Sequence, residues 1–260
     1  RELAQREILG YPPHRRLLRI GVTGRRLGDV VAAADDVARY AAGDRPVTLH
    51  VTHSWGGGVA RWIETWIDFD TENVNLQLRA EGPQTGQGCG QRYSLYLSNR
   101  LDAPVASWWL QPPILSSGES NPAYREMLNQ VIDRHGVGRV MVSSLVGHTL
   151  DALATGRPTL QVLHDYYPAW PLLGEHPGPW LQDGRPVDLD AALQAHDLLP
   201  ELSDLDAAGW RRLATRWQET VAAQDVALVA PSRSVVDLLR RIDPAWADLA
   251  IEVVPHGLPE

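Results

Sequence analysis

The sequence contains no lysine, because all 24 of its basic residues are arginine. This absence excludes a Walker-type phosphate loop and a Schiff-base site, since both need a lysine amine. Cysteine is almost as scarce: Cys89 stands alone, so no internal disulfide and no Cys-x-x-Cys metal or redox motif can form. This cysteine usage favours a reducing compartment.

Long apolar runs are also missing. The longest stretch without a charge lies between Asp102 and Glu119, and it is too short and too rich in proline for a membrane span. At the start of the chain, Arg1, Glu2 and Arg6 interrupt any apolar run, so we expect no signal peptide there.

What remains is the composition of an ordinary globular protein. The 260 residues are 44% hydrophobic and 22% charged, which is enough to build a buried core. The formal net charge of -8 argues against nucleic acid as a partner. His50 and His53 are three apart in a predicted strand and point to opposite faces, so they do not form a metal pair, and we expect no metal site.

The hydrophobic pattern divides the chain into a lead-in and one larger domain. Residues 1–46 have rough helical spacing and predict a helical lead-in or a linker from an upstream segment. From 47 to 254, strands alternate with helices, which favours an α/β fold with a mainly parallel, Rossmann-like sheet covered by helices on both faces. Strands are expected at 47–54, 73–79, 93–98, 105–110, 140–144, 159–163, 226–230 and 251–254, helices at 59–67, 121–135, 150–154, 210–221 and 234–241, and an irregular stretch at 166–204.

Three glycines, Gly56, Gly57 and Gly58, separate the first strand from the helix that follows. At such a helix N-terminus the unpaired N–H groups and the helix dipole attract an anion, and the missing Cβ atoms let it approach. The turn therefore predicts a site for a diphosphate or a carboxylate, although a tight turn without a ligand has the same pattern. A dinucleotide fingerprint fits poorly because it needs a third glycine at Arg61, but Glu81 near the end of the second strand keeps that alternative open.

Two histidines follow later strands. His164 and Asp165 end the strand at 159–163, and His148 lies just beyond the strand at 140–144. Ligands of open α/β sheets bind outside the carboxyl ends of the strands, so either imidazole is a candidate to bond a sugar hydroxyl or a phosphate. Tyr166 begins an aromatic cluster that either stacks on a sugar ring or packs in the core. A structural role is the alternative for both histidines.

Four segments occur in a characteristic order: VTHSWGGGVARWI, RPTLQVLHDYYPAWP, VALVAPSRSVVDLL and VVPHG. Together they resemble the N-terminal domain of GT-B glycosyltransferases of the family-4 type, also called group 1, and they occur in order within residues 47–257. The resemblance implies two facing Rossmann-like domains. Residues 47–254 would be the acceptor-binding domain, and 255–260 would begin the linker to a C-terminal domain that holds the nucleotide-sugar.

The resemblance also implies which residues contact the substrates. Many members have a cleft histidine where this chain has Ser143 and Ser144, which makes Ser144 a candidate contact and leaves open whether His148 takes over the role of that histidine. The other implied residues are Gly56, Gly57 and Gly58 beside the donor diphosphate and the acceptor, His164 and Asp165 in the cleft, and Ser232 and Arg233 facing the partner domain.

The implied reaction is transfer of a sugar from a nucleotide-sugar to a glycan or lipid-linked acceptor, with retention at the anomeric carbon, in bacterial surface polysaccharide synthesis. Positioning and stabilisation of the leaving diphosphate would supply the catalysis, no metal or other cofactor is expected, and this stretch alone should be inactive. The expected location is cytoplasmic, and the arginine-rich lead-in is compatible with peripheral contact with the inner membrane. Two alternatives stay open: a non-catalytic Rossmann-like binding module, and an NAD(P)-dependent oxidoreductase with a degenerate glycine loop.

Overall fold

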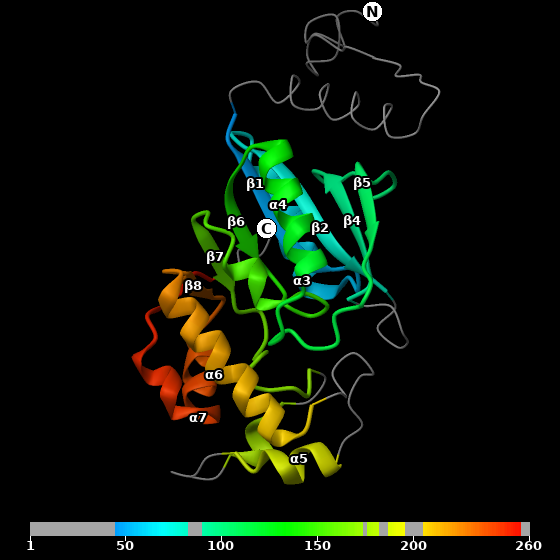
Figure 1. Cartoon of the computed structure of the whole chain (residues 1–260). Helices are drawn as coiled ribbons and strands as arrows, with labels where there is room; N and C mark the ends of the chain where they lie inside the picture. The colour runs from blue at the N-terminus through cyan, green and yellow to red at the C-terminus, as the bar shows by residue number, and fades with distance from the viewer. Residues whose placement is uncertain (1–44, 83–89, 174–175, 182–186, 196–204, 256–260) are drawn as a thin grey trace, which may run out of the picture. The chain divides into compact units, whose positions relative to one another are not determined.

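The computed structural model describes residues 45–82, 90–173, 176–181, 187–195 and 205–255 (Figure 1). The chain divides into two compact units, residues 1–43 and 44–260, and every described residue belongs to the second unit. The predicted lead-in at 1–46 and the predicted linker at 255–260 lie outside the described residues, apart from positions 45, 46 and 255 at their borders.

The described part is built on one eight-stranded sheet with the strand order β5-β4-β2-β1-β6-β7-β8-β9. The six strands from β2 to β9 in this order run parallel, and β4 and β5 extend the sheet as an antiparallel pair. The predicted Rossmann-like α/β fold class is confirmed. The strands are β1 (Val47–His53), β2 (Val74–Glu81), β4 (Arg92–Leu97), β5 (Ala106–Trp109), β6 (Val137–Val142), β7 (Thr159–Val162), β8 (Ala227–Ala230) and β9 (Ile251–Val253).

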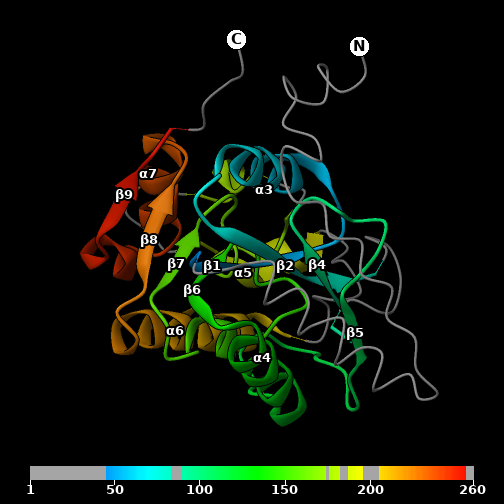
Figure 2. The same cartoon turned by 90° about the horizontal axis from the view of Figure 1, so that it is seen from above.

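Helices cover both faces of the sheet. On one face lie α3 (Gly57–Phe69) and α7 (Arg233–Ile242), and on the other lie α4 (Pro122–His135) and α6 (Ala207–Ala223) (Figure 2). A shorter helix, α5 (Leu189–Ala195), contacts α6. The 3-10 helices are η1 (Leu150–Leu153), η2 (Gly178–Trp180) and η4 (Pro244–Asp248).

The local sequence explains where these helices begin and end. The Asn121 side chain accepts a hydrogen bond from the backbone N–H of Tyr124 at 3.0 Å and starts α4, while Gly136 ends it with φ of 61°. Asp206 caps α6 in the same way. Gly56 precedes α3 without any side-chain cap, so the first N–H groups of α3 have no side-chain acceptor there.

The two faces of the sheet differ in chemistry. Toward α4 and α6, alternate residues of β1 are Val47, Leu49 and Val51, and they belong to the main apolar core. Toward α3, the alternate residues are polar and nevertheless buried. They are Thr48, His50 and Thr52 of β1 and Asn75, Gln77 and Arg79 of β2.

Hydrogen bonds link this polar face to α3. Gln77 Nε2 donates to Asn99 Oδ1 at 3.2 Å, and Asn99 Nδ2 donates to the Glu64 carbonyl of α3 at 3.0 Å. His50 Nε2 and Asn75 Oδ1 are 2.9 Å apart, and Asn75 in turn donates to a carboxylate at the end of α3. These bonds satisfy polar groups that would otherwise be costly to bury.

Two predicted elements differ in the structure. The stretch at 166–204 is not irregular throughout, because its described residues include η2 and α5. Only Leu189 and Ala192 of α5 are buried, so a helix this short gives little periodicity among prolines and acids. The predicted helix at 150–154 is the 3-10 turn η1, which the Thr149 side chain caps.

Candidate functional site

The sheet order creates a topological switch point between β1 and β6. From β1 the chain passes through α3 to β2 on one side, and it later returns through α4 to β6 on the other side. Segments that leave the carboxyl ends of these two strands diverge, which is the usual ligand position in open α/β sheets. We call the described residues that follow β1, β2, β6, β7 and β8 the carboxyl edge. All predicted site residues lie on it.

The glycine turn follows β1 and is open to solvent. Gly56 and Gly57 have φ of 80° and 73°, in the left-handed region that favours glycine. A Cβ added to Gly56, Gly57 or Gly58 would meet nothing within 4 Å. Ser54 fixes the start of the turn, because its N–H donates to the Ala80 carbonyl at 3.0 Å. The turn therefore offers exposed backbone at the uncapped N-terminus of α3, as an anion requires.

Two serines follow β6 on the other side of the switch point. The backbone N–H of Ser143 donates to the Val51 carbonyl at 2.9 Å, which holds it beside the end of β1. Its hydroxyl is buried and has no hydrogen-bond partner in the described part of the chain. Ser144 is also buried, and its Oγ accepts the Val146 N–H at 3.1 Å. Ser144 thus shapes the loop, whereas Ser143 has a hydroxyl left to pair with a ligand or water.

His148 lies in the interior and has both ring nitrogens engaged. Nε2 is 2.8 Å from the Thr52 carbonyl, and Nδ1 is 2.7 Å from the Tyr124 hydroxyl. A carbonyl only accepts, so Nε2 carries the proton and Nδ1 accepts from Tyr124. Burial lowers the pKa of His148 to about 4, which keeps the ring neutral. In this arrangement no ring nitrogen is left to bond a sugar. His148 therefore fits the structural role and not the predicted role of contacting the substrate.

His164 and Asp165 follow β7. The His164 ring packs edge-on against Trp62 of α3, with ring centroids 4.9 Å apart, so it lies on the α3 side of the edge. Asp165 Oδ1 accepts the Tyr167 N–H at 2.9 Å. Burial raises the pKa of Asp165 to about 6. The hydrogen bond from Tyr167 lowers this pKa, but its effect is smaller than that of burial. Both residues remain partly exposed, and a carboxyl with that pKa can exchange a proton near neutrality.

The aromatic cluster after β7 divides between core and surface. Tyr167 and Trp170 are buried, and the Tyr167 hydroxyl donates to Ser117 Oγ at 2.6 Å. Tyr166 is half-buried, and its ring lies edge-on to His176 with centroids 6.3 Å apart. Burial, and then the charge of Asp165, raise the pKa of Tyr166. Of these three aromatics, Tyr166 is the one with a partly exposed face for a sugar.

Ser232 and Arg233 follow β8 at the start of α7. Ser232 Oγ lies 2.7 Å from Ser234 Oγ and accepts the Val235 N–H at 3.4 Å, so it is the N-cap of the helix. Arg233 is exposed. Because β8 runs parallel to β7, this pair lies at the same edge of the sheet as His164 and Asp165.

Sequence reasoning missed the residues that line the end of β1. His53 and Trp55 stack with ring centroids 4.8 Å apart, and His53 Nδ1 accepts the Trp55 N–H at 3.2 Å. Burial, and then the cation of Arg79, lower the pKa of His53 to about 4. The Trp55 indole Nε1 is buried and lacks an acceptor among the described residues. No spacing motif marks this pair as a site, and only the strand register brings Arg79 beside it, opposite Thr52.

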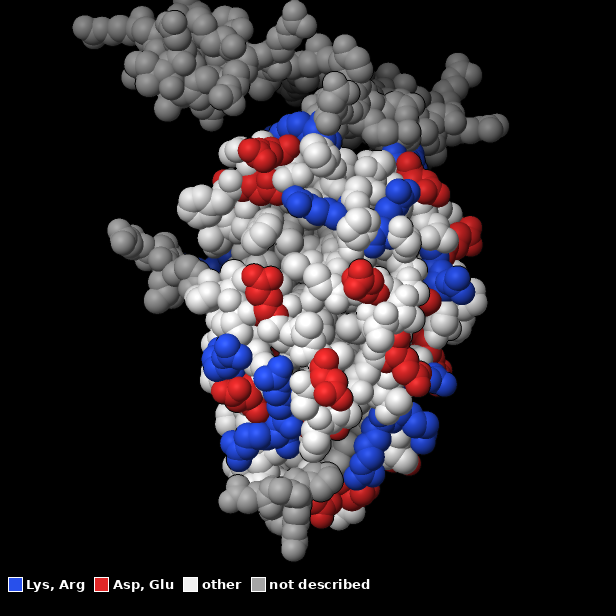
Figure 3. Space-filling model, turned by 90° about the vertical axis from the view of Figure 1, so that its left-hand side faces the viewer, with Lys and Arg blue, Asp and Glu red and all other residues white. Residues whose placement is uncertain are grey.

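Charges on the surface do not gather by sign on the face shown in Figure 3. Acidic and basic side chains of the described residues are interspersed there. Within the described ranges, no three His, Cys, Asp or Glu side chains group closely enough to hold a metal ion. None of the helices in that part of the chain is long and apolar enough to cross a membrane.

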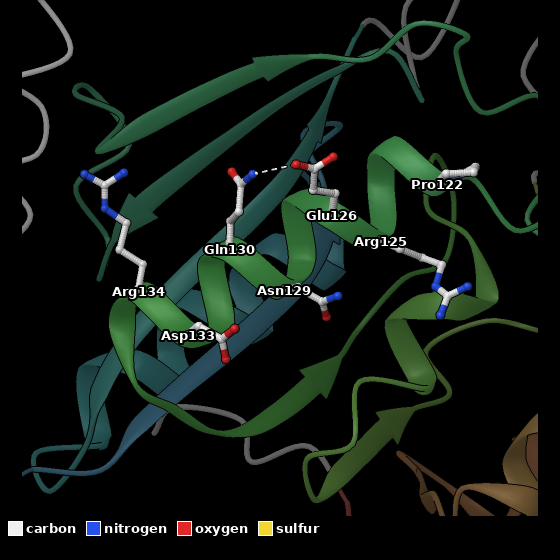
Figure 4. Close-up of a pocket in the computed structure, with 7 residues that line it drawn as sticks. All are labelled: Pro122, Arg125, Glu126, Asn129, Gln130, Asp133 and Arg134. Atoms are coloured by element: carbon white, nitrogen blue, oxygen red, sulfur yellow. Dashed lines mark hydrogen bonds between the residues drawn. The ribbon is translucent and has the colours of Figure 1, made fainter.

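A shallow hollow lies elsewhere, along the outer face of α4 (Figure 4). Its side chains all come from that one helix and point outward, and Glu126 accepts a hydrogen bond from Gln130 at 3.2 Å. No predicted site residue lines it. The lining residues are Pro122, Arg125, Glu126, Asn129, Gln130, Asp133 and Arg134. A single solvated helix face does not build a ligand site, so the carboxyl edge remains the candidate.

A scan against protein-family models, a search of curated proteins and a search of solved structures each gave no match. Function therefore has to be inferred from the carboxyl edge and from the sequence segments that end on it.

Proposed function

We propose that this chain is the acceptor-side domain of a retaining GT-B glycosyltransferase, which transfers a sugar from a nucleotide-sugar to a glycan or lipid-linked acceptor in bacterial surface polysaccharide synthesis. The observation that carries the proposal is the convergence of the resembling segments on one edge of the sheet. Gly56–Gly58 follow β1, His164–Asp165 follow β7, and Ser232–Arg233 follow β8, and these strands are parallel. A catalytic cleft in such an enzyme needs all three segments on the side that faces the second domain.

In this proposal the glycine turn receives the diphosphate of the donor. The uncapped N–H groups at the start of α3 stabilise the negative charge that develops as the sugar leaves. The open space above Gly56 and Gly57 lets the phosphate oxygens approach the backbone. No side-chain base is needed here, because the leaving diphosphate itself helps to deprotonate the acceptor hydroxyl.

The segment after β7 holds the sugar and the acceptor. His164 is oriented by Trp62 and donates to or accepts from a hydroxyl, while Tyr166 offers its partly exposed ring face. Asp165, with its raised pKa, accepts a hydroxyl hydrogen bond or holds a proton near neutral pH. His148 positions the loop after β6 and is left out of the contacts. The donor nucleotide is assigned to a C-terminal domain.

The proposal is tested on the longer protein that contains this chain. We expect that protein to release nucleotide from at least one nucleotide-sugar. The His164→Ala variant should lower turnover by about tenfold or more, because it loses a positioned hydrogen bond, while its melting temperature stays unchanged. Gln130→Ala, on the outer face of α4, is the control and should keep full turnover. Unchanged turnover in His164→Ala removes His164 from the site, and no consumption of any nucleotide-sugar removes the proposal.

A dinucleotide-binding oxidoreductase is the second candidate, and Glu81 is the observation that favours it. Glu81 is the last residue of β2, where an acidic residue of a dinucleotide site bonds the ribose. One of its oxygens, however, already accepts the Tyr96 hydroxyl at 2.8 Å, and Arg61 stands where the third glycine is needed. Calorimetric titration of this chain with NAD and NADP separates the two candidates, since only the oxidoreductase should bind either one tightly.

A further inference from the structure

Arg79 of β2 is a nearly buried cation that has no anionic partner among the described residues. The residue is 8% exposed, and its guanidinium lies over the Tyr96 ring, 5.9 Å from the centroid. Its Nε–H has no acceptor, and no carboxylate among the described residues forms an ion pair with it. An aromatic face compensates a buried charge only in part, so such an arginine is costly unless something else binds it.

The acids on the same face of the sheet are engaged elsewhere. Glu81 Oε1 accepts the Tyr96 hydroxyl at 2.8 Å, which fixes the ring under the guanidinium. Asp70, at the end of α3, accepts hydrogen bonds from Asn73 at 2.7 Å and from Asn75 at 3.3 Å. Asp70 also lies 3.8 Å from Arg139, which is the paired arginine of this face. None of these carboxylates therefore forms an ion pair with Arg79.

The position of Arg79 links it to the glycine turn. Its Cα is paired with Thr52 in the ladder between β1 and β2, near the end of both strands. The next residue, Ala80, accepts the Ser54 N–H that fixes the start of the turn. The charge of Arg79 also depresses the pKa of His53, so the guanidinium is within electrostatic range of the end of β1. Two sources of positive potential, Arg79 and the uncapped start of α3, thus lie at the same end of one sheet face.

We propose that Arg79 binds a phosphate group of a ligand that enters at the carboxyl edge beside the glycine turn. A phosphate suits this position better than a carboxylate does. A guanidinium takes two of its oxygens, and the remaining oxygens stay available to other donors, while the N–H groups at the start of α3 stay with the donor diphosphate. The identity of the ligand rests on the proposed function. If this chain is the acceptor-side domain, the ligand is the acceptor, and the acceptor carries a phosphate group.

The test is a calorimetric titration of the 260-residue chain with inorganic phosphate and with glucose 1-phosphate. We expect both to bind, and we expect Arg79→Gln to weaken both by about tenfold or more, because a charge-assisted bidentate contact is lost. Arg92→Gln is the matched control. It removes the same charge from an exposed residue opposite Glu81, and screening by solvent should limit its effect to about twofold.

A second variant keeps the proposal testable if Arg79→Gln folds poorly. Arg79→Met removes the unpaired charge and keeps an apolar stem on Tyr96, so its melting temperature without phosphate should equal or exceed that of the wild type. Phosphate should raise the melting temperature of the wild type but not that of Arg79→Met. A wild type that ignores phosphate, or equal losses in Arg79→Gln and Arg92→Gln, overturns the proposal.

Titration of the longer protein that contains this chain with UDP separates the acceptor from the donor. Under the proposal Arg79→Gln leaves UDP binding unchanged, and an equal loss of UDP binding would overturn the assignment to the acceptor. Loss of phosphate binding in Arg79→Gln, together with no consumption of nucleotide-sugars by the longer protein, keeps the Arg79 phosphate site and removes the proposed function. The two failures are therefore distinguishable.

Discussion

At the scale of single residues, His148 joins the loop after β6 to β1 and to α4. It donates to Thr52 at the end of β1, accepts from Tyr124 of α4, and stands next to Gly147, whose carbonyl accepts the Tyr93 hydroxyl. Its neutral ring is required for this pattern, because protonation would leave Nδ1 unable to accept from Tyr124. At neutral pH the ring therefore connects the loop after β6 to β1 and α4, and protonation breaks the hydrogen bond to Tyr124.

The pH dependence of stability follows from the lowered pKa of His148. The unfolded chain takes up the proton near pH 6.5, whereas the folded chain takes it up only near pH 4. The contribution of His148 to stability is thus fully present above about pH 6.5 and declines as the pH falls toward 4. We expect His148→Gln to lower the unfolding free energy at pH 7 by about 1–3 kcal/mol, since the amide does not reproduce the ring geometry that bonds Thr52 and Tyr124 together.

The diagnostic measurement is the slope of the unfolding free energy against pH between 6.5 and 4, from urea titrations. His148→Gln should show a slope smaller by up to about one proton than that of the wild type. His176→Gln, at an exposed loop position, is the control and should change the unfolding free energy by less than about 0.5 kcal/mol. An unchanged slope in His148→Gln would mean that this ring does not stay neutral when buried.

Asp165 has the opposite linkage. Its folded pKa of about 6 lies above the ordinary value of 3.8, so the contribution of Asp165 to stability is greatest below pH 3.8 and is lost as the pH rises through 6. We expect Asp165→Asn to raise the unfolding free energy at pH 7 by about 1–3 kcal/mol, because the amide oxygen still accepts from Tyr167 and no charge is buried. The gain should shrink at pH 4.5. Asp190→Asn, at an exposed position in α5, should show no gain at either pH.

At the scale of elements, the glycine turn and α3 act together. Gly57 needs φ of 73°, while Gly58 has no such requirement, although both have open space for a Cβ. Gly57→Ala should therefore lower the unfolding free energy by about 1–2 kcal/mol through backbone strain. Gly58→Ala should leave it unchanged or raise it by up to about 1 kcal/mol, since alanine favours the helix.

Chemical denaturation measures the unfolding free energy of both variants. Each introduces alanine, and the two positions are adjacent, so they differ mainly in the required φ. Equal effects at the two positions would show that the left-handed conformation of Gly57 is not required. If Gly57→Ala alone is destabilising, the turn holds its backbone in the conformation that exposes the N–H groups of α3.

The elements that the sequence predicts best are those with a strong local pattern. Strand β1 and helix α3 show clear periods of two and 3.6 residues around Gly56–Gly58, and both form near the expected bounds. The helix α5 and the 3-10 turn η1 have too few residues for a period to stand out. The strands β4 and β5 were expected as two short strands, with a hairpin or a β-rich insertion as the possible arrangement, and they pair antiparallel; the pairing of β4 with β2 depends on residues more distant in the sequence.

The candidate site was predictable as a set of strand ends but not as a set of contacts. The carboxyl edge follows from the βα alternation, which places Gly56–Gly58 and His164 on the same side. That His148 is buried with both nitrogens engaged does not follow, because Tyr124 is 24 residues away in the sequence. Arg79 was missed for a different reason. In an alternating strand a polar residue is expected to face water, yet α3 covers this face of the sheet and Arg79 is buried.

At the scale of the whole described sheet, the switch point separates strands β5-β4-β2-β1 from strands β6-β7-β8-β9. The site residues are divided between these halves, with the glycine turn and Arg79 in the first and His164, Asp165 and Ser232 in the second. Their relative placement depends on the packing that holds the second half rigid. Trp217 of α6 is central to it, since Nε1 donates to Gln161 of β7 at 2.8 Å and the ring stacks on Trp246 with centroids 4.3 Å apart.

We therefore expect Trp217→Ala to be among the most destabilising single changes. The residue is fully buried, so truncation leaves a cavity against Trp246 and an unpaired Gln161, at a cost of about 3–5 kcal/mol in unfolding free energy. Trp217→Phe should cost less, because it refills most of the space, and Trp109→Ala at a position that is 60% exposed should cost under about 0.5 kcal/mol. Urea denaturation measures all three. A small loss in Trp217→Ala would mean that β7, and with it His164, is held by other contacts than the stacked tryptophans.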